Sequence, residues 1–570
     1  MSDILYIGFH KSHDSSLCLT TAEGEMLFVA NEERFTRKKL QAGIPFQCKE
    51  YLLKHYKVGP VVFCYGGLKV KDRLKREAAF HMASLAKGLN TPPLHHDIGK
   101  LYGRLTGRND NPNRPKLFDG FDIQEVVHVD HHDCHAASAY YQSGCDEAIV
   151  MTLDGLGDCF SAAFYRGRGS KLERTRAYYH NDVTIGEDYE MMTALLGFNP
   201  HRHPGKITGL AAHGVYNEAC IRAVRDFFKK VWKKGNRNFF YEFHTEKEED
   251  AVAELRRLRD TMFGKFSRED MAFTIQYLCE EDTIALIKEN VSEPANHNIC
   301  LAGGVFANVK LNKRVHELGF RNVFVQPAMS DAGLATGAVL WHLGATKGLR
   351  PYALKNVYGG PGYPQAEIEA ACKAEGLEYE VVNPIEPRIA QLLAGGAVVA
   401  RFEGRMEFGP RALGHRSILY AAKDPTVNDW LNKRLQRTEF MPFAPSTLWE
   451  YADQSFERVN GAHHTAQFMT ITFDCTPWFR ETCPAAVHVD GTARPQLVRK
   501  DESPSYWTLI DEYRKLTGVP TVINTSFNMH EEPIVCTPAD AVRAFMDGHL
   551  DWLAMDNVLV RNPQLESKKA

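Results

Sequence analysis

The chain has 570 residues and a mass of 64.3 kDa, which is too long for one hydrophobic core and predicts about two to four domains. Its 68 basic and 71 acidic residues nearly cancel, which argues against the overall basic field that drives non-specific binding of nucleic acid. The thirteen cysteines are scattered, which argues against a disulfide-rich secreted protein, and no basic leader is present. No apolar run approaches the roughly 18 residues of a membrane span. We therefore expect a cytoplasmic protein that acts on small molecules.

The first predicted element is a hairpin. A strand over residues 4–9 is followed by a polar turn that contains His13 and Asp14, and a second strand runs over 17–20. These residues alone favour ordinary turn chemistry somewhat over a functional site. His13 is therefore only a candidate at this point.

A basic run, Lys69–Arg76, and an Asn-, Asp- and Pro-rich stretch, Arg108–Pro115, come next. The simplest interpretation of the basic run is a solvated helix face. A second basic run, Lys229–Lys234, has the same interpretation. We assign neither run to nucleic-acid binding.

Two histidines four residues apart, His131 and His135, would project from one face of a helix, as two ligands of one metal ion must. In a chain with 24 histidines this spacing is expected about once by chance, so the alternative is a polar helix end with satisfied imidazoles.

The apolar run 148–153 then ends in Asp154 and Gly155, which predicts a strand that delivers a carboxylate into a turn open to phosphate. A return strand over 160–165 repeats the order of the first hairpin. This echo predicts a duplicated fold of the actin-like ATPase type, with a nucleotide between the two copies.

Further along, glycines recur beside candidate ligand groups. Lys206 lies between small residues, where it can contact phosphate or simply sit in a packing turn. Gly303 and Gly304 separate a strand from a helix start that contains Asn308, an arrangement that suits an anion. Asp331 reads as a helix N-cap, but it also follows a predicted parallel strand and can complete a site of two histidines and two aspartates.

A Gly- and Pro-rich stretch, residues 358–363, marks a change of texture, and we expect the domains to cover residues 1–352 and 353–570. The second domain has arginines beside glycines, which predicts a phosphate-rich ligand, although surface Arg–Glu pairs are the alternative. It ends in a strand, residues 523–528, whose polar side chains alternate.

Nine motifs in this order resemble the NodU/CmcH/TobZ-type O-carbamoyltransferase family over essentially the whole chain. They are His13-Asp14, Glu32–Thr36, the His131/His135 segment, Leu153–Gly155, Gly303–Val305, Ser330–Gly333, Phe408–Gly414, Gly491–Gln496 and Asn524–Asn528.

The resemblance implies an α/β protein with an N-terminal actin-like (ASKHA/TsaD-like) duplicated domain and a C-terminal YrdC-like domain. The C-terminal domain would make carbamoyl adenylate and pyrophosphate from carbamoyl phosphate and ATP with Mg. The N-terminal domain would transfer the carbamoyl group to a hydroxyl and release AMP.

The resemblance also implies site residues. His13 would be the catalytic base. Iron(II) or another divalent metal would be bound by His131, His135, Asp154 and Asp331, and the adenylate would contact Lys38, Gly155, Lys206, Gly303, Gly304 and Asn308. Carbamoyl phosphate and ATP would contact Arg411, Arg416, Lys433, Arg437, Arg494, Asn524, Ser526 and Asn528. The family often has Lys and Arg where Gln436 and Met441 stand here, so their role is left open.

The expected acceptor is a hydroxylated small molecule such as a sugar, a nucleoside or a natural product, bound by segments such as Lys69–Pro115. Nucleic-acid and membrane partners are not expected, and a homodimer is left open. The alternatives are a threonylcarbamoyl-type transferase acting on tRNA and a non-catalytic nucleotide-binding metal protein. The near-neutral charge argues against the first and the arginine-rich second domain against the other.

Overall fold

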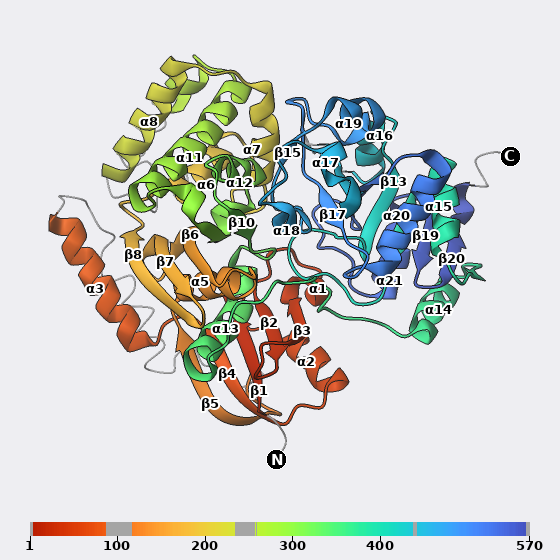
Figure 1. Cartoon of the computed structure of the whole chain (residues 1–570), viewed down its shortest axis with the longest axis horizontal. Coiled ribbons are helices and arrows are strands. Elements are labelled where there is room, and N and C mark those ends of the chain that lie inside the picture. The colour runs from red at the N-terminus through yellow and green to blue at the C-terminus, as the bar shows by residue number, and fades with distance from the viewer. Residues whose placement is uncertain (1–3, 87–116, 234–256, 258, 437–441, 566–570) are drawn as a thin grey trace.

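The structure is a computed structural model that describes residues 4–86, 117–233, 257, 259–436 and 442–565. Arg437, Met441 and residues 87–115 of the predicted acceptor segment lie outside the described residues. Two sheets are built from the first part of the chain and a larger mixed sheet from the last part (Figure 1). The protein is therefore of the mixed α/β class, as predicted.

The first two sheets have the same topology. Sheet one has the order β3-β2-β1-β4-β5, and sheet two has the order β8-β7-β6-β9-β10. In each, the first three strands are antiparallel and the last two run parallel to the first. The strands are β1 (Leu5–His10), β2 (Ser16–Thr20), β3 (Met26–Asn31), β4 (Pro60–Gly66), β5 (Asp122–Val129), β6 (Glu147–Gly157), β7 (Phe160–Arg168), β8 (Lys171–Tyr179), β9 (Asn298–Ala302) and β10 (Asn322–Val325). This repeat confirms the predicted actin-like duplication.

Two helices pack between the first two sheets. Helix α5 (His131–Tyr141) packs on β6 and β9, helix α13 (Leu334–Lys347) packs on β1 and β4, and the two helices pack on each other. Both are rich in small residues, which lets their backbones approach closely. The other helices of this half are α1 (Glu32–Thr36), α2 (Phe46–His55), α3 (Val70–Ala86), α6 (Ile185–Leu195), α7 (Pro204–Leu210), α8 (Glu218–Lys233), α11 (Arg268–Asn290) and α12 (Val309–His316).

The third sheet has eight strands in the order β11-β20-β19-β12-β13-β18-β14-β17. They are β11 (Glu380–Val381), β12 (Val399–Phe402), β13 (Arg416–Ala421), β14 (Ala444–Leu448), β17 (Gln496–Val498), β18 (Thr521–Ser526), β19 (Trp552–Met555) and β20 (Val558–Arg561), and a small pair is formed by β15 (Phe473–Asp474) and β16 (Thr492–Ala493). The helices are α14 (Gln365–Ala374), α15 (Glu386–Ala394), α16 (Val427–Arg434), α17 (Ala452–Ser455), α18 (His463–Ala466), α19 (Pro477–Thr482), α20 (Pro504–Thr517) and α21 (Pro538–Asp547).

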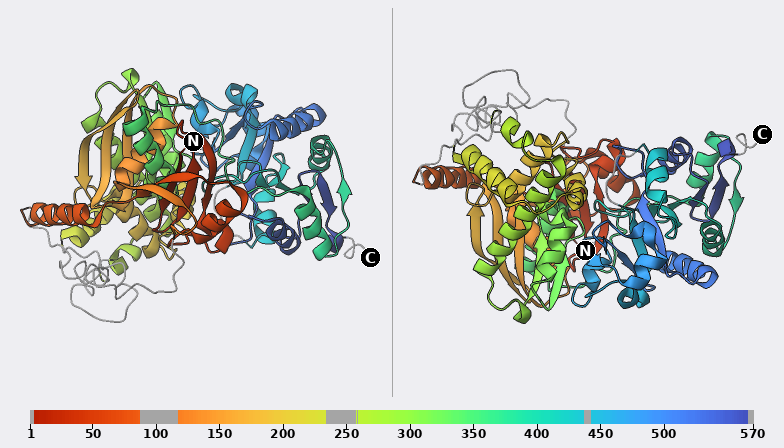
Figure 2. Two further views of the ribbon diagram at one scale, coloured as in Figure 1. Left: turned by 90° about the horizontal axis from the view of Figure 1, so that it is seen from below. Right: turned by 90° about the horizontal axis from the view of Figure 1, so that it is seen from above.

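The third sheet and its helices lie beside the duplicated half in an elongated molecule (Figure 2). Backbone groups join the two: the N–H of Val323 on β10 donates to the carbonyl of Gly461 at 2.8 Å. Arg34 donates to the carbonyl of Gly409 at 2.8 Å, and Arg37 donates to the carbonyls of Pro533 and Ile534, each at 2.7 Å. Because these are buried or half-buried hydrogen bonds, the halves form one packed body.

All thirteen cysteines lie within the described residues and are free thiols, as expected for a reduced protein. Among the helices that the structure describes, none combines the length and the apolar character needed to cross a bilayer.

Candidate metal centre and interdomain cavity

Helix α5 presents the histidine pair. Its N-cap, Asp130, accepts a hydrogen bond from the backbone N–H of His132 at 2.9 Å, which fixes where the helix begins. His131 and His135 therefore project from the same face, and their Nε2 atoms lie 3.1 Å apart. Both rings are buried.

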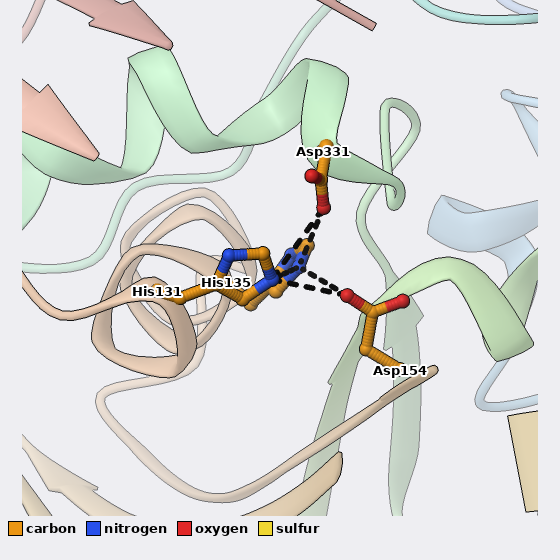
Figure 3. A group of neighbouring side chains, drawn as sticks. All are labelled: His131, His135, Asp154 and Asp331. Atoms are coloured by element: carbon orange, nitrogen blue, oxygen red, sulfur yellow. Dashed lines mark hydrogen bonds and ion pairs between the residues drawn. The ribbon is translucent and has the colours of Figure 1, made fainter. Parts of the chain in front are cut away.

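Two carboxylates from separate elements converge on these nitrogens (Figure 3). Asp154 lies near the end of β6, and its Oδ2 is 3.0 Å from Nε2 of His131 and 3.6 Å from Nε2 of His135. Asp331 begins the short turn before α13, and its Oδ1 lies 3.4 Å and 3.7 Å from the same two nitrogens. One ligand atom of each residue lies within 4.8 Å of all the others.

The geometry suits one metal ion. Donors bound at about 2.0–2.2 Å, with angles between octahedral and tetrahedral, lie roughly 2.8–3.6 Å apart. The His–His and His–Asp separations of 3.0–3.7 Å are close to this range. Two nitrogen and two carboxylate donors fit iron(II), zinc and other divalent ions alike, so the donor set does not select one of them.

The electrostatics of the cluster agree with a cation site. Burial alone would lower the pKa of His131, but Asp331 and the hydrogen bond with Asp154 outweigh it and raise that pKa to about 10. Burial alone would raise the pKa of Asp154, but its hydrogen bonds with His131 and His135 hold it well below the usual range. A positive charge is thus strongly favoured here, and a metal would compete with the proton on His131.

Residues of the first hairpin surround Asp331. The hydroxyl of Ser12 donates to Asp331 Oδ2 at 2.6 Å, and Nε2 of His10 lies 3.3 Å from the same oxygen. His13 follows, with Nδ1 3.8 Å from Asp331 Oδ2, and 63% of its side chain is exposed. His13 is therefore beside the cluster and accessible to a bound molecule.

Glycines at the strand ends shape the same region. Gly303 has a φ of +109°, and a Cβ there would lie 2.2 Å from the carbonyl oxygen of Leu153, so a side chain is excluded. The N–H of Gly304 donates to Asp154 Oδ1 at 3.2 Å. Asn308 caps α12 and bonds Gln276 at 2.8 Å, and a Cβ on Gly155 would have no atom closer than 4.0 Å.

A second feature is a cavity of about 300 Å³ between the two halves of the chain. One wall comes from the region of α7, including Lys206, and the other from β18 and neighbouring loops of the third sheet. Five of the predicted carbamoyl-phosphate and ATP residues line it: Arg411, Arg494, Asn524, Ser526 and Asn528. The cavity thus brings together residues that the sequence separates by more than 300 positions.

Other predicted ligands lie elsewhere. Lys38 is exposed, and the next residue, Lys39, lines the cavity instead. Arg416 is fully buried and donates to the carbonyls of Glu403 and Gly404 at 2.7 and 3.0 Å, so its guanidinium is occupied by the fold. Lys433 and Gln436 are exposed, and neither lines the cavity.

Sequence reasoning missed several residues of the cavity wall, among them Arg202, His203 and Glu531. The run His201-Arg202-His203 directly precedes the predicted Lys206 segment and was the available signal. Glu531 had no signal, because its role depends on a contact made across the cavity.

Two similar proteins each match about the full length of this chain. An uncharacterized protein of Synechocystis sp. is 32% identical over 97% of this chain and 96% of its own length. Nodulation protein NolNO of Sinorhizobium fredii is 30% identical over 97% of this chain and 81% of its own length. HypF of T. kodakarensis superposes with a TM-score of 0.28 at 13% identity, over 61% of this chain and 48% of HypF, a score too low to support an argument.

The family descriptions settle the assignment. Residues 5–340 match the carbamoyltransferase N-terminus and residues 390–562 match the carbamoyltransferase C-terminus. These matches contain the four residues of the metal cluster and all the predicted ligands of the C-terminal half. The chain belongs to the carbamoyltransferase family of enzymes.

Proposed function

We propose that the protein is an ATP-dependent O-carbamoyltransferase that works in two steps, with residues 353–570 performing the first and residues 1–352 the second. The observation that supports this proposal is the shared cavity, whose walls hold cationic side chains from both halves of the chain, Lys206 from the first and Arg411 and Arg494 from the second.

In the first step, carbamoyl phosphate is hydrolysed to carbamate and phosphate. A carbamate oxygen then attacks the α-phosphorus of Mg-ATP, which forms carbamoyl adenylate and releases pyrophosphate. Arg411 and Arg494 suit the phosphates because a guanidinium makes planar, bidentate contacts to phosphoryl oxygens. Asn524, Ser526 and Asn528 supply amide and hydroxyl groups on the same wall.

In the second step, the hydroxyl of the acceptor attacks the carbamoyl carbon, the bond from that carbon to the phosphate oxygen breaks, and AMP leaves. His13 is exposed beside the cluster and accepts the proton of the hydroxyl. A divalent ion held by His131, His135, Asp154 and Asp331 would supply Lewis acidity toward phosphate and carbonyl oxygens. Gly303 and Gly304 let the backbone pack closely against Leu153 and Asp154, beside the metal cluster where the adenylate would bind.

The acceptor we propose is a hydroxylated small molecule. A formal net charge of −3 favours this class over a tRNA, which would require an extensive basic surface.

Exchange of labelled pyrophosphate into ATP tests the first step. We expect label in ATP only when carbamoyl phosphate is present, and no such exchange would overturn the adenylate route.

His13→Asn should retain the exchange and lose carbamoyl transfer by about 100-fold or more, as removal of a general base does. His128→Asn, an exposed histidine on β5, is the matched control and should retain both. Loss of both activities in His13→Asn would contradict separate sites.

A further inference from the structure

A contact between the two halves of the chain forms part of the cavity wall. Glu531 Oε1 accepts a hydrogen bond from Nε2 of His203 at 2.7 Å, and its Oε2 lies 3.2 Å from a guanidinium nitrogen of Arg202. His203 and Arg202 precede α7, whereas Glu531 belongs to the loop between β18 and α21. The contact therefore spans the cavity from the N-terminal half to the C-terminal half.

The tautomer of His203 follows from its neighbours. The backbone N–H of Asn199 donates to Nδ1 of His203 at 3.1 Å, so Nδ1 has no proton and Nε2 carries it. A neutral imidazole thus donates to Glu531 without needing to be protonated. Arg202 supplies the permanent positive charge of the cluster.

Both sides of the contact are held in position by their own half. Asn199 Oδ1 accepts the backbone N–H groups of His201 and Arg202, each at 3.1 Å. On the other side, the amide of Asn528 donates to the carbonyls of Met529 and Glu532, at 3.0 and 2.7 Å. Asn528 also lines the cavity, so the loop that carries Glu531 is tied to the proposed substrate site.

The charge of the cavity makes this contact unusual. Among the described residues that line it, Lys39, Arg202, Lys206, Arg411 and Arg494 are cationic and Glu531 is the one carboxylate. A carboxylate repels phosphates, so its presence does not serve phosphate binding. Burial alone would raise the pKa of Glu531, but His203, Lys39 and Arg202 hold it at about 2, so the carboxylate is ionised throughout the working range.

The position of the contact supplies the reason. The side chains of Arg202 and Glu531 are 38% and 32% exposed, whereas Lys206 and Asn524 are buried deeper in the same cavity. The contact therefore lies at the mouth. The following inference rests on the proposed function. We propose that Glu531, which bonds His203 and Arg202, is a latch that closes the mouth of the cavity and retains carbamoyl adenylate until the acceptor reacts.

The latch protects the intermediate from water. If carbamoyl adenylate escapes, water attacks it and gives AMP and carbamic acid, which decomposes to ammonia and carbon dioxide. An open mouth therefore uncouples ATP consumption from carbamoylation. The quantity that reports the latch is the AMP formed per molecule of carbamoylated acceptor.

The test compares Glu531→Gln with Glu532→Gln in the full-length protein. Both changes remove one carboxylate of similar exposure from the same loop. Glu532, however, pairs at 2.6 Å with Arg543 of α21 within the C-terminal half, and its contact with Arg37 of the N-terminal half is a long one, at 3.8 Å. We expect Glu531→Gln to retain carbamoyl-phosphate-dependent pyrophosphate exchange. It should raise about two- to fivefold, the scale of a half-exposed ion pair, the AMP that is formed in excess of the carbamoylated acceptor. Glu532→Gln should match the wild type.

A second measurement is independent of the chemistry. Hydrogen–deuterium exchange of the peptide that covers residues 199–210 should be faster in Glu531→Gln than in the wild type and Glu532→Gln. His203→Ala should have the same effect, and the double variant should add little to either single change. Unchanged deuterium exchange overturns the latch, and faster exchange with an unchanged AMP-to-product ratio overturns its role in retention. Absence of pyrophosphate exchange in the wild type contradicts instead the proposed function.

Discussion

At the scale of single residues, the metal cluster depends on a glycine that is not one of its ligands. A Cβ on Gly157 would lie 2.0 Å from Cδ2 and 2.6 Å from Nε2 of the His131 ring. The bare backbone of Gly157 is therefore what allows the ring to point at Asp154 and Asp331. Such a neighbour orients a ligand as effectively as a hydrogen bond does.

We predict that Gly157→Ala lowers metal affinity by about tenfold or more, because the methyl group displaces the His131 ring. Gly155→Ala, two residues away, meets no atom closer than 4.0 Å and should bind metal as the wild type does. Metal content after equilibration with iron(II) and dialysis measures both. Equal metal content in the two variants would contradict this account.

Arg411 and Arg416 are close in sequence but have different environments. Arg411 lines the cavity, whereas Arg416 stacks on Phe402 at 3.5 Å and donates to backbone carbonyls. We predict that Arg416→Met lowers the melting temperature by about 5–10 °C, because buried carbonyls lose their donor. Arg411→Met should change melting by less than about 2 °C and mainly weaken pyrophosphate exchange. Calorimetry distinguishes the two, and a stable Arg416→Met would refute the structural role.

The sequence could predict which residue types form the site but not each position. The metal-binding candidates could be predicted because local sequence patterns mark them: a helical spacing marks His131 and His135, and the end of a predicted strand marks Asp154 and Asp331. Lys38 and Lys39 do not differ in type. Arg37, with a φ of +59°, ends α1, so which lysine faces the cavity depends on a backbone turn that residue types do not encode.

At the scale of elements, α6 and α8 meet at a half-buried acid. Asp188 accepts hydrogen bonds from Thr184, the N-cap of α6, and from the indole of Trp232 on α8, both at 2.7 Å. Burial outweighs these bonds and raises the pKa of Asp188 to about 7. The folded protein therefore binds this proton more tightly than the unfolded chain does.

The sign of the pH effect follows. Because the folded-state pKa lies above the ordinary value, stability is greatest below about pH 4 and falls as the pH rises towards about 7, where the carboxylate is charged in both states. We predict that Asp188→Asn removes this loss and melts higher than the wild type at pH 8, with the difference shrinking at pH 5. Melting curves at the two pH values measure it, and a constant difference would exclude Asp188 as the cause.

Elements show where local patterns suffice and where they fail. The repeated strand, turn, strand order was readable because hydrophobic runs and polar turns mark hairpins, and both sheets confirm it. The basic run 69–76 was predicted to be a solvated face, which is wrong for Arg76. That guanidinium bonds Asp130, the N-cap of α5, and lies 4.8 Å from the ring of Phe160. The periodicity of a helix cannot predict this contact, because Asp130 lies 54 residues away in the sequence.

At the scale of the whole molecule, Arg34 and Arg37 join the two halves of the chain. Arg37 donates to the carbonyls of Pro533 and Ile534. We predict that Arg37→Met lowers the melting temperature by several degrees and splits the calorimetric transition, because about 1–3 kcal/mol of interface stability is lost. Lys38→Met, at an exposed neighbour, should melt as one unit like the wild type. A single, unshifted transition in Arg37→Met would show that other contacts suffice.

The hydrogen bond between Val323 and Gly461 has a consequence for attempts to divide the chain. β10 is the edge strand of its sheet, and the C-terminal half covers it: the N–H of Val325 donates to Thr465 Oγ1 at 2.6 Å, and Phe324 stacks on His464. A fragment cut at residue 352 would expose an apolar strand with unpaired backbone groups, which recruits other strands. The C-terminal half thus shields this edge strand from other chains, and a heterologously expressed N-terminal fragment should aggregate unless its partner is supplied.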